Sequence, residues 1–263
     1  MITLFLKASG RKPFRAGGEM GNYRIIYEDR EILVCYKASG LPVQSGCIGV
    51  KDLESILNLH LKEEGCREGI RIIHRLDQPV EGILVFGKTK KAAAELGRQI
   101  QENKMEKTYL AVSCIQDEAK ASGLLTDDFV RVTHLLLKDA RTNTSRIVPE
   151  GMKGAKKAAL CCRRLKEVAQ GEQGRFALME IRLITGRHHQ IRVQMAGSGM
   201  PLYGDRKYNP QWENWAKAAG QEPEKASPAL CAAKLVFFHP VTGKKVEFSI
   251  SPSGKIFQIL QKI

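Results

Sequence analysis

Two segments of the chain combine side chains that could do chemistry on a polyanion. The first, Ile73 to Asp77, places Arg75 two positions before Asp77 at the end of an apolar, strand-like run. The second, Gly186 to Arg192, supplies two arginines where a strand-like pattern turns into a helical one. A lone carboxylate can act as a base or a nucleophile, and arginine can bind phosphate or stack on a base. Together, the two segments could supply a catalytic set that acts on a polyanion.

Composition agrees with a polyanionic partner. The chain has 263 residues, enough for one large domain or two small ones, and a formal net charge of +14. Charge alone leaves nucleic acid and an anionic membrane surface both open. Aromatic residues make up only 6% of the chain, which argues against a broad base-stacking platform.

The cysteines and the amino-terminal segment bear on location. Seven cysteines form no CxxC pair, which favours a reducing cytosol over a disulfide framework or a zinc ribbon. No apolar run is long enough to span a membrane. The basic, acid-poor segment before Glu19 resembles a transit peptide weakly, and a basic arm or first strand is the favoured interpretation. We expect a cytoplasmic protein.

Hydrophobic periodicity predicts the elements that position these residues. Strand patterns cover 23–27, 32–36, 70–73, 83–86, 108–113, 129–137, 146–148, 158–168, 176–184, 230–238 and 246–250. Helix patterns run from Leu53, after Asp52 as N-cap, to a stop at Gly65, from Thr89 through Ile100, over 190–196, and over 255–263. Residues 209–228, with both tryptophans, indicate an irregular insertion. We predict one α+β domain over 23–263 with a mostly antiparallel sheet, after a basic leader at 1–22.

Six motifs in order resemble those of the RluA-type RNA pseudouridine synthases, over about Tyr23 to Pro252. They are Tyr36-Lys-Ala-Ser-Gly-Leu-Pro-Val43, His74-Arg-Leu-Asp77 with Gly82, Lys107-Thr-Tyr-Leu-Ala-Val112, Gly186-Arg-His-His-Gln-Ile-Arg192, Gly204-Asp205, and His239-Pro240 with Thr242-Gly243. The resemblance implies a large mixed sheet with a central cleft. It also implies isomerisation of uridine to pseudouridine in structured RNA, either ribosomal or transfer RNA. The reaction is neither a redox step nor a hydrolysis, so we expect no cofactor.

The resemblance assigns roles to individual residues. Asp77 is the essential carboxylate, either as the nucleophile or as the base that removes a ribose proton. Arg75 fills the space left by the extruded base or holds phosphates, Tyr109 stacks on the target base, and Arg192 pairs with Asp77. Arg187 binds phosphate or a backbone carbonyl. Three of these residues also have a plainer interpretation: Asp77 as a turn cap, Arg75 as a surface ion pair, and Tyr109 as a core side chain.

The chain departs from the family pattern at three places. Val80-Glu81-Gly82 stands where relatives commonly carry Thr-Ser before the glycine, and Lys37-Ala38 replaces the usual Lys-Pro. Too few residues precede Tyr23 for the S4-type RNA-binding domain of many relatives. Glu81 is expected to face solvent. If it faced the site instead, its charge would raise the pKa of Asp77.

Two further groups of residues need an interpretation. The acid-free run from Lys153 to Lys166 is either a solvated face or an RNA contact, for which Lys156, Lys157, Arg163 and Arg164 are candidates. His188 and His189 are adjacent and are expected to face apart, so no metal site is predicted.

Two other functions stay open. One is a catalytically silent RNA-binding module of the same fold, against which the presence of Asp77 argues. The other is a glycoside hydrolase with Asp77 and Glu81 as paired carboxylates, for which +14 has no explanation. The partner expected is RNA, not a membrane, with the protein a monomer.

Overall fold

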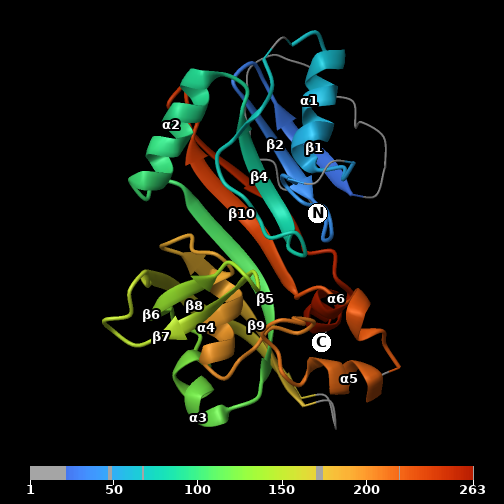
Figure 1. Cartoon of the computed structure of the whole chain (residues 1–263), viewed down its shortest axis with the longest axis vertical. Coiled ribbons are helices and arrows are strands. Elements are labelled where there is room, and N and C mark those ends of the chain that lie inside the picture. The colour runs from blue at the N-terminus through green and yellow to red at the C-terminus, as the bar shows by residue number, and fades with distance from the viewer. Residues whose placement is uncertain (1–21, 47–48, 67, 170–173, 219, 263) are drawn as a thin grey trace. The chain divides into compact units, whose positions relative to one another are not determined.

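The computed structural model describes residues 22–46, 49–66, 68–169, 174–218 and 220–262. Nearly all of the expected leader, 1–22, lies outside the described residues. Contacts divide the chain into two compact units: residues up to Lys107 with Ala232–Ser251, and Thr108–Cys231 with Pro252–Ile263. We call them unit 1 and unit 2 (Figure 1).

Unit 1 carries a sheet with the strand order β1-β2-β4-β10. Its strands are β1 (Tyr23–Glu28), β2 (Ile32–Lys37), β3 (Arg71–Ile72), β4 (Glu81–Gly87), most of β10 (Leu230–Phe238) and β11 (Lys245–Ser249). β3 pairs with β4, and β11 pairs with β10. All seven residues of β4 are buried, which explains why Ile83 to Phe86 form a continuous apolar run rather than an alternation.

Two helices of unit 1 begin where the sequence predicts. α1 (Leu53–Glu63) starts after Asp52, whose carboxylate accepts from Ser55 N at 2.8 Å. α2 (Lys90–Gln101) starts after Thr89, whose hydroxyl accepts from Ala92 N at 3.1 Å. Each cap satisfies a backbone N–H that has no partner inside the helix.

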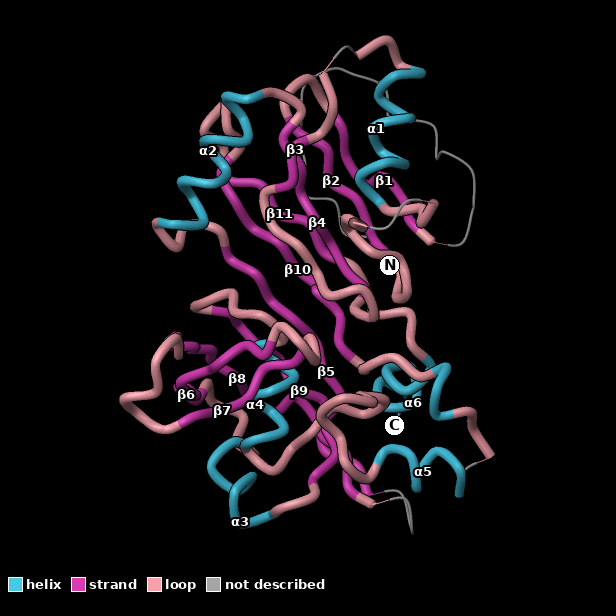
Figure 2. Tube along the Cα trace, in the orientation of Figure 1, coloured by secondary structure: helices cyan, strands magenta, loops and turns pink. Residues whose placement is uncertain are grey.

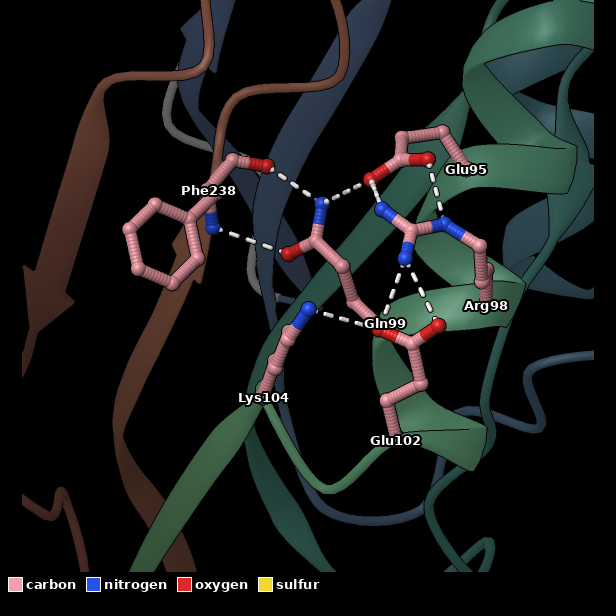
Figure 3. Close-up of polar contacts among 6 residues, drawn as sticks. All are labelled: Glu95, Arg98, Gln99, Glu102, Lys104 and Phe238. Carbon is pink, nitrogen blue, oxygen red and sulfur yellow. Dashed lines mark hydrogen bonds and ion pairs between the residues drawn. The ribbon is translucent and has the colours of Figure 1, made fainter.

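A buried glutamine joins α2 to the end of β10 (Figure 3). The Gln99 side-chain amide donates to Phe238 O at 2.8 Å and accepts from Phe238 N at 2.9 Å, so it pairs with that residue as a neighbouring strand would. Arg98, on the same helix, bridges Glu95 and Glu102. Gln99 therefore holds α2 against the end of β10, whereas the ion pairs of Arg98 connect only residues of α2 and its C-cap.

Unit 2 carries antiparallel strands of the same 11-stranded sheet, in the order β5-β9-β8-β6-β7 (strands magenta in Figure 2). Its strands are β5 (Glu106–Ile115), β6 (Val130–Asp139), β7 (Thr144–Val148), β8 (Lys156–Ala169) and β9 (Arg175–Leu183). α4 (Gln190–Gly197) packs on one face, where Val193 meets Leu136 and Ala158. The remaining helices are α3 (Glu118–Ala121), α5 (Trp212–Ala218) and α6 (Lys255–Lys262), with 3-10 turns at Ser122–Leu124 and Pro223–Lys225.

The α+β class and the predominance of antiparallel pairing are therefore as predicted. The interpretation of 209–228 as wholly irregular is wrong, because α5 forms there. Trp212 is 3% exposed and lies 4.7 Å from the Tyr203 ring, so aromatic packing supports a short helix that the prolines around it obscure.

Candidate active site

Asp77 lies in a loop between β3 and β4, in unit 1. Leu76 is 7% exposed and anchors the loop to the core, while Arg75 on one side is exposed and Asp77 on the other is half-buried. Val80 N donates to Asp77 O at 3.0 Å, which closes a tight turn after the aspartate. Burial lowers the pKa of His74 well below its usual value, and the neutral ring accepts from Val85 N at 3.3 Å.

A buried lysine ties this loop to the end of β2. Lys37 is fully buried, and its Nζ donates to Leu41 O at 2.8 Å, Gln78 O at 3.0 Å and Ala38 O at 3.1 Å. Burial lowers the pKa of Lys37 to about 8, while the carboxylates of Asp77 and Glu81 act in the opposite direction. Lys37 is thus a cation that interacts electrostatically with Asp77, and it also binds the carbonyl of Gln78, the residue after Asp77.

Glu81 does not face solvent, so that expectation is wrong. Its exposure is 6%, and its carboxylate accepts from Tyr36 Oη at 2.7 Å. β2 and β4 pair in antiparallel register, with Lys37 opposite Gly82, and this pairing brings Tyr36 within reach of Glu81. The hydroxyl and the nearby Lys37 ammonium explain how a carboxylate can occupy this buried position.

Gly82 cannot carry a side chain in this arrangement. Its φ is +144°, and a Cβ would lie 2.4 Å from the Ala232 Cβ and 2.6 Å from Ala232 N. The glycine therefore lets β10 approach β4 just after the Asp77 loop. Sequence reasoning found this residue by resemblance, and the contact supplies its physical reason.

In unit 2, the segment from Gly186 to Arg192 leads from β9 into α4. Gln190 is 3% exposed, and its Oε1 accepts from Arg187 N at 2.9 Å and from Thr185 Oγ1 at 2.7 Å. Arg187 itself is exposed and donates from Nε to Lys157 O at 3.0 Å. Either a phosphate or a backbone carbonyl was expected as the partner of Arg187, and the structure shows its hydrogen bond to a backbone carbonyl.

The two histidines do not face apart. Their rings stack with centroids 3.7 Å apart, because His189 has φ +51° at the cap of α4 and neither strand nor helix alternation applies there. His188 contacts Ser145 Oγ at 2.9 Å, and His189 Nδ1 lies 2.7 Å from Tyr208 Oη. Burial, with Arg192 nearby, lowers the pKa of His189 to about 3, so this ring is neutral at physiological pH.

Arg192 forms a buried, two-pronged ion pair with Asp205. Nε and Nη2 of Arg192 donate to the two Asp205 oxygens at 2.8 and 2.7 Å, and the side chains are 4% and 0% exposed. Asp205 also accepts from Lys207 N at 3.0 Å, and the Tyr208 ring lies 5.0 Å from the guanidinium. Sequence reasoning included Asp205 in a motif but missed this role, because thirteen residues separate the partners and no local pattern links them.

The remaining candidates lie on the sheet of unit 2. Tyr109, on β5, is 6% exposed and sits opposite Ile181 of β9. Arg163 and Arg164 each pair with acids that the acid-free run does not contain, Arg163 with Glu180 and Arg164 with Asp127 and Glu167. Lys156 and Lys157 are exposed on opposite faces of β8. The four basic candidates therefore do not share one surface.

Two searches of the described residues bear on ligands and membranes. Among them, no group of three or more His, Cys, Asp or Glu side chains is placed to hold a metal ion. None of their helices has the length and apolar character of a membrane span.

Comparison with known proteins identifies the family to which this fold and its Asp77 loop belong. Residues 31–197 match the model of the RNA pseudouridylate synthase family. The chain is 30% identical over 231 residues to the uncharacterized RNA pseudouridine synthase YhcT of Bacillus subtilis, covering 87% of this chain and 68% of that protein. It is 28% identical to ribosomal large subunit pseudouridine synthase C of Buchnera aphidicola, covering 85% and 65%.

A solved human structure, RNA Pseudouridylate Synthase Domain Containing 4, shares the fold. It aligns with a TM-score of 0.68 at 20% identity, covering 89% of this chain and 91% of that one. The chain belongs to the RNA pseudouridylate synthase family. The RluA-type resemblance, the fold class and the prediction of an RNA pseudouridine synthase are confirmed. The chain spans about two thirds of the length of the curated relatives it matches, 68% and 65%.

Proposed function

We propose that this protein converts specific uridines to pseudouridine in structured RNA, with Asp77 as the essential carboxylate. The reaction breaks the N1–C1′ bond, turns the uracil, and joins C5 to C1′ while a proton leaves C5 and N1 gains one. A carboxylate near the ribose serves either mechanism, attack on the nucleotide or removal of a ribose proton. Atoms and electrons balance without an oxidant or a reductant.

The observation that carries this proposal is the surroundings of Asp77. A carboxylate loses its charge when burial is not offset by a cation. Lys37 is such a cation: its Nζ lies 3.0 Å from Gln78 O, and Asp77 acts electrostatically on it. Because Lys37 uses its donors on backbone carbonyls, it supplies charge to the site while the turn after Asp77 keeps its shape.

The other roles are proposed residue by residue. Arg75 is exposed beside Asp77 and fills the place of the extruded base or holds phosphates, since extrusion costs roughly a few kcal/mol. Tyr109 stacks on the target uracil, and Arg192 acts as a cation toward the carboxylate while Asp205 orients it. Arg187 contacts the RNA backbone from the turn before α4.

The proposed substrate is ribosomal RNA rather than transfer RNA. This rests on relatives whose names specify the large ribosomal subunit. A cytoplasmic location is also proposed, because the seven cysteines of the sequence form no CxxC pair, a pattern that favours a reducing compartment. We propose a monomer that needs no cofactor.

Asp77→Asn tests the catalytic assignment. The amide keeps the shape and removes the charge, so we expect release of tritium from RNA labelled at uridine C5 to fall to background, with RNA affinity retained. Asp128→Asn, at an exposed aspartate of unit 2, is the matched control and should turn over normally. If Asp77→Asn retained substantial turnover, the assignment would be wrong. If the wild type bound RNA without any release, the silent RNA-binding module would be the better description.

A further inference from the structure

In unit 2, part of the sheet face opposite α4 is exposed, whereas residues such as Phe176 and Leu178 of that face are buried. Leu136 and Ala158 face α4, and residues paired across strands share a face. Lys156 lies opposite Leu136 and therefore shares the α4 side, whereas Lys157 lies opposite Leu135 on the other side. Tyr109 pairs with Ile181, and Ile181 with Cys162, which puts the tyrosine on the α4 side as well. We call the other side the open face.

The open face is strongly basic. Alternation along the registers places on it six basic residues and two acidic ones: Arg131, Arg146, Lys157, Arg163, Lys166 and Arg182, with Glu180 and Asp139. Asp139 is occupied at the β6–β7 turn, where it accepts from Arg141 N at 2.9 Å. Four of the basic residues, Arg131, Arg146, Lys157 and Arg182, are exposed.

Part of the charge is held in a fixed geometry. Arg131 pairs with Cys161, and Cys161 with Arg182, so the two arginines flank one thiol across three strands. Arg182 lies 3.9 Å from the centroid of the Phe129 ring, and Arg163 lies 4.8 Å from it. Glu180 bonds Arg163 at 2.6 Å and Arg182 at 3.3 Å. Ring and carboxylate therefore limit how far the guanidinium groups can move, which lowers the entropy cost of binding an anion.

We infer that the open face is a second RNA-contacting surface, which binds the phosphate backbone of structured RNA on the side of the sheet away from Tyr109. This rests on the proposed RNA substrate. Charge complementarity identifies the occupant: guanidinium and ammonium groups spaced over several strands match the repeating charge of a nucleic-acid backbone. Contacts to phosphate carry no sequence information, so this surface adds affinity and orientation.

The test compares two double variants that remove the same charge from different surfaces. Arg131→Gln/Lys157→Gln alters the open face, and Lys90→Gln/Lys91→Gln alters the exposed start of α2 in unit 1. All four residues are exposed, so both variants should fold as the wild type does in thermal denaturation. The probe is a transcript of large-subunit ribosomal RNA, titrated at several salt concentrations.

We expect the open-face variant to bind more weakly and to flatten the slope of log Kd against log salt by roughly two units, about one for each lost phosphate contact. The α2 variant should keep both the wild-type slope and the wild-type single-turnover rate at saturating RNA. Equal slopes in the two variants would overturn the inference and leave the face to an acidic protein or to solvent. Tritium release by the wild type, measured in the same samples, tests the proposed function independently of the salt dependence.

Discussion

At the scale of single residues, the environment of Lys37 makes a pH-dependent prediction. Its pKa is lowered from 10.5 to about 8, because the folded protein removes the ammonium from water. Between about pH 8 and pH 10.5 the unfolded chain therefore binds more protons at this site than the folded protein. Stability must then rise with pH across that window, and the cost of the buried charge is fully present below it.

The measurement is the free energy of urea unfolding of wild type and Lys37→Met at several pH values. We expect the wild type to gain on the variant from about pH 8 to pH 10.5, by at most about 1.4 kcal/mol per pH unit. Lys107, whose pKa burial also lowers to about 8, is present in both proteins and cancels. Lys90→Met, at an exposed position, serves as control. Parallel profiles would show that Lys37 is not desolvated.

A second residue-scale prediction concerns the pair of Arg192 and Asp205. Arg192→Met leaves the fully buried Asp205 carboxylate without the guanidinium, and losing one partner of a buried pair costs about 3–5 kcal/mol. We expect a loss of that order in urea unfolding, together with reduced turnover. Lys217→Met breaks the exposed pair with Glu213 on α5 and should change nothing measurable. An unaltered melting temperature for Arg192→Met would contradict the buried pair.

At the scale of elements, Gln99 is the residue that seats α2 against the end of β10. Gln99→Leu keeps the volume but removes two partly buried hydrogen bonds to Phe238, each worth about 0.5–1.5 kcal/mol. We expect the variant to lower the melting temperature clearly. Gln101→Leu, at an exposed position two residues on, should be near neutral. Equal effects would mean that general helix propensity, rather than this contact, explains the change.

Sequence patterns predicted helices and strands better than they predicted the contacts of individual site residues. Alternation and caps predicted α1, α2 and the long strands to within a few residues, since a cap such as Asp52 or Thr89 is a local interaction. α5 was missed because its stability comes from packing of Trp212 and Tyr203, residues that the sequence does not bring together. The basic run of β8 looked continuous, yet pleating divides it between two faces.

At the scale of the whole molecule, the family and the α+β class followed from motifs and their order, whereas the partners of site residues did not. In the sequence, Lys37 drew attention only because Ala38 follows it in place of the usual proline. Nothing in the sequence indicates that Lys37 is buried and bonded to three carbonyls. Glu81 was expected in solvent because a charged side chain is rarely buried. Tyr36 reverses that expectation only once β2 and β4 are paired.

The thiols make the open face accessible to direct observation. Burial raises the pKa of Cys114 to about 12 and of Cys162 to about 11, so both resist alkylation, and Cys35 and Cys231 are buried as well. Cys161 is partly exposed between Arg131 and Arg182, and Cys66 is partly exposed in unit 1. Within the described chain, Cys161 is thus a native attachment point for a fluorophore between two arginines, and Cys66 is an internal reference.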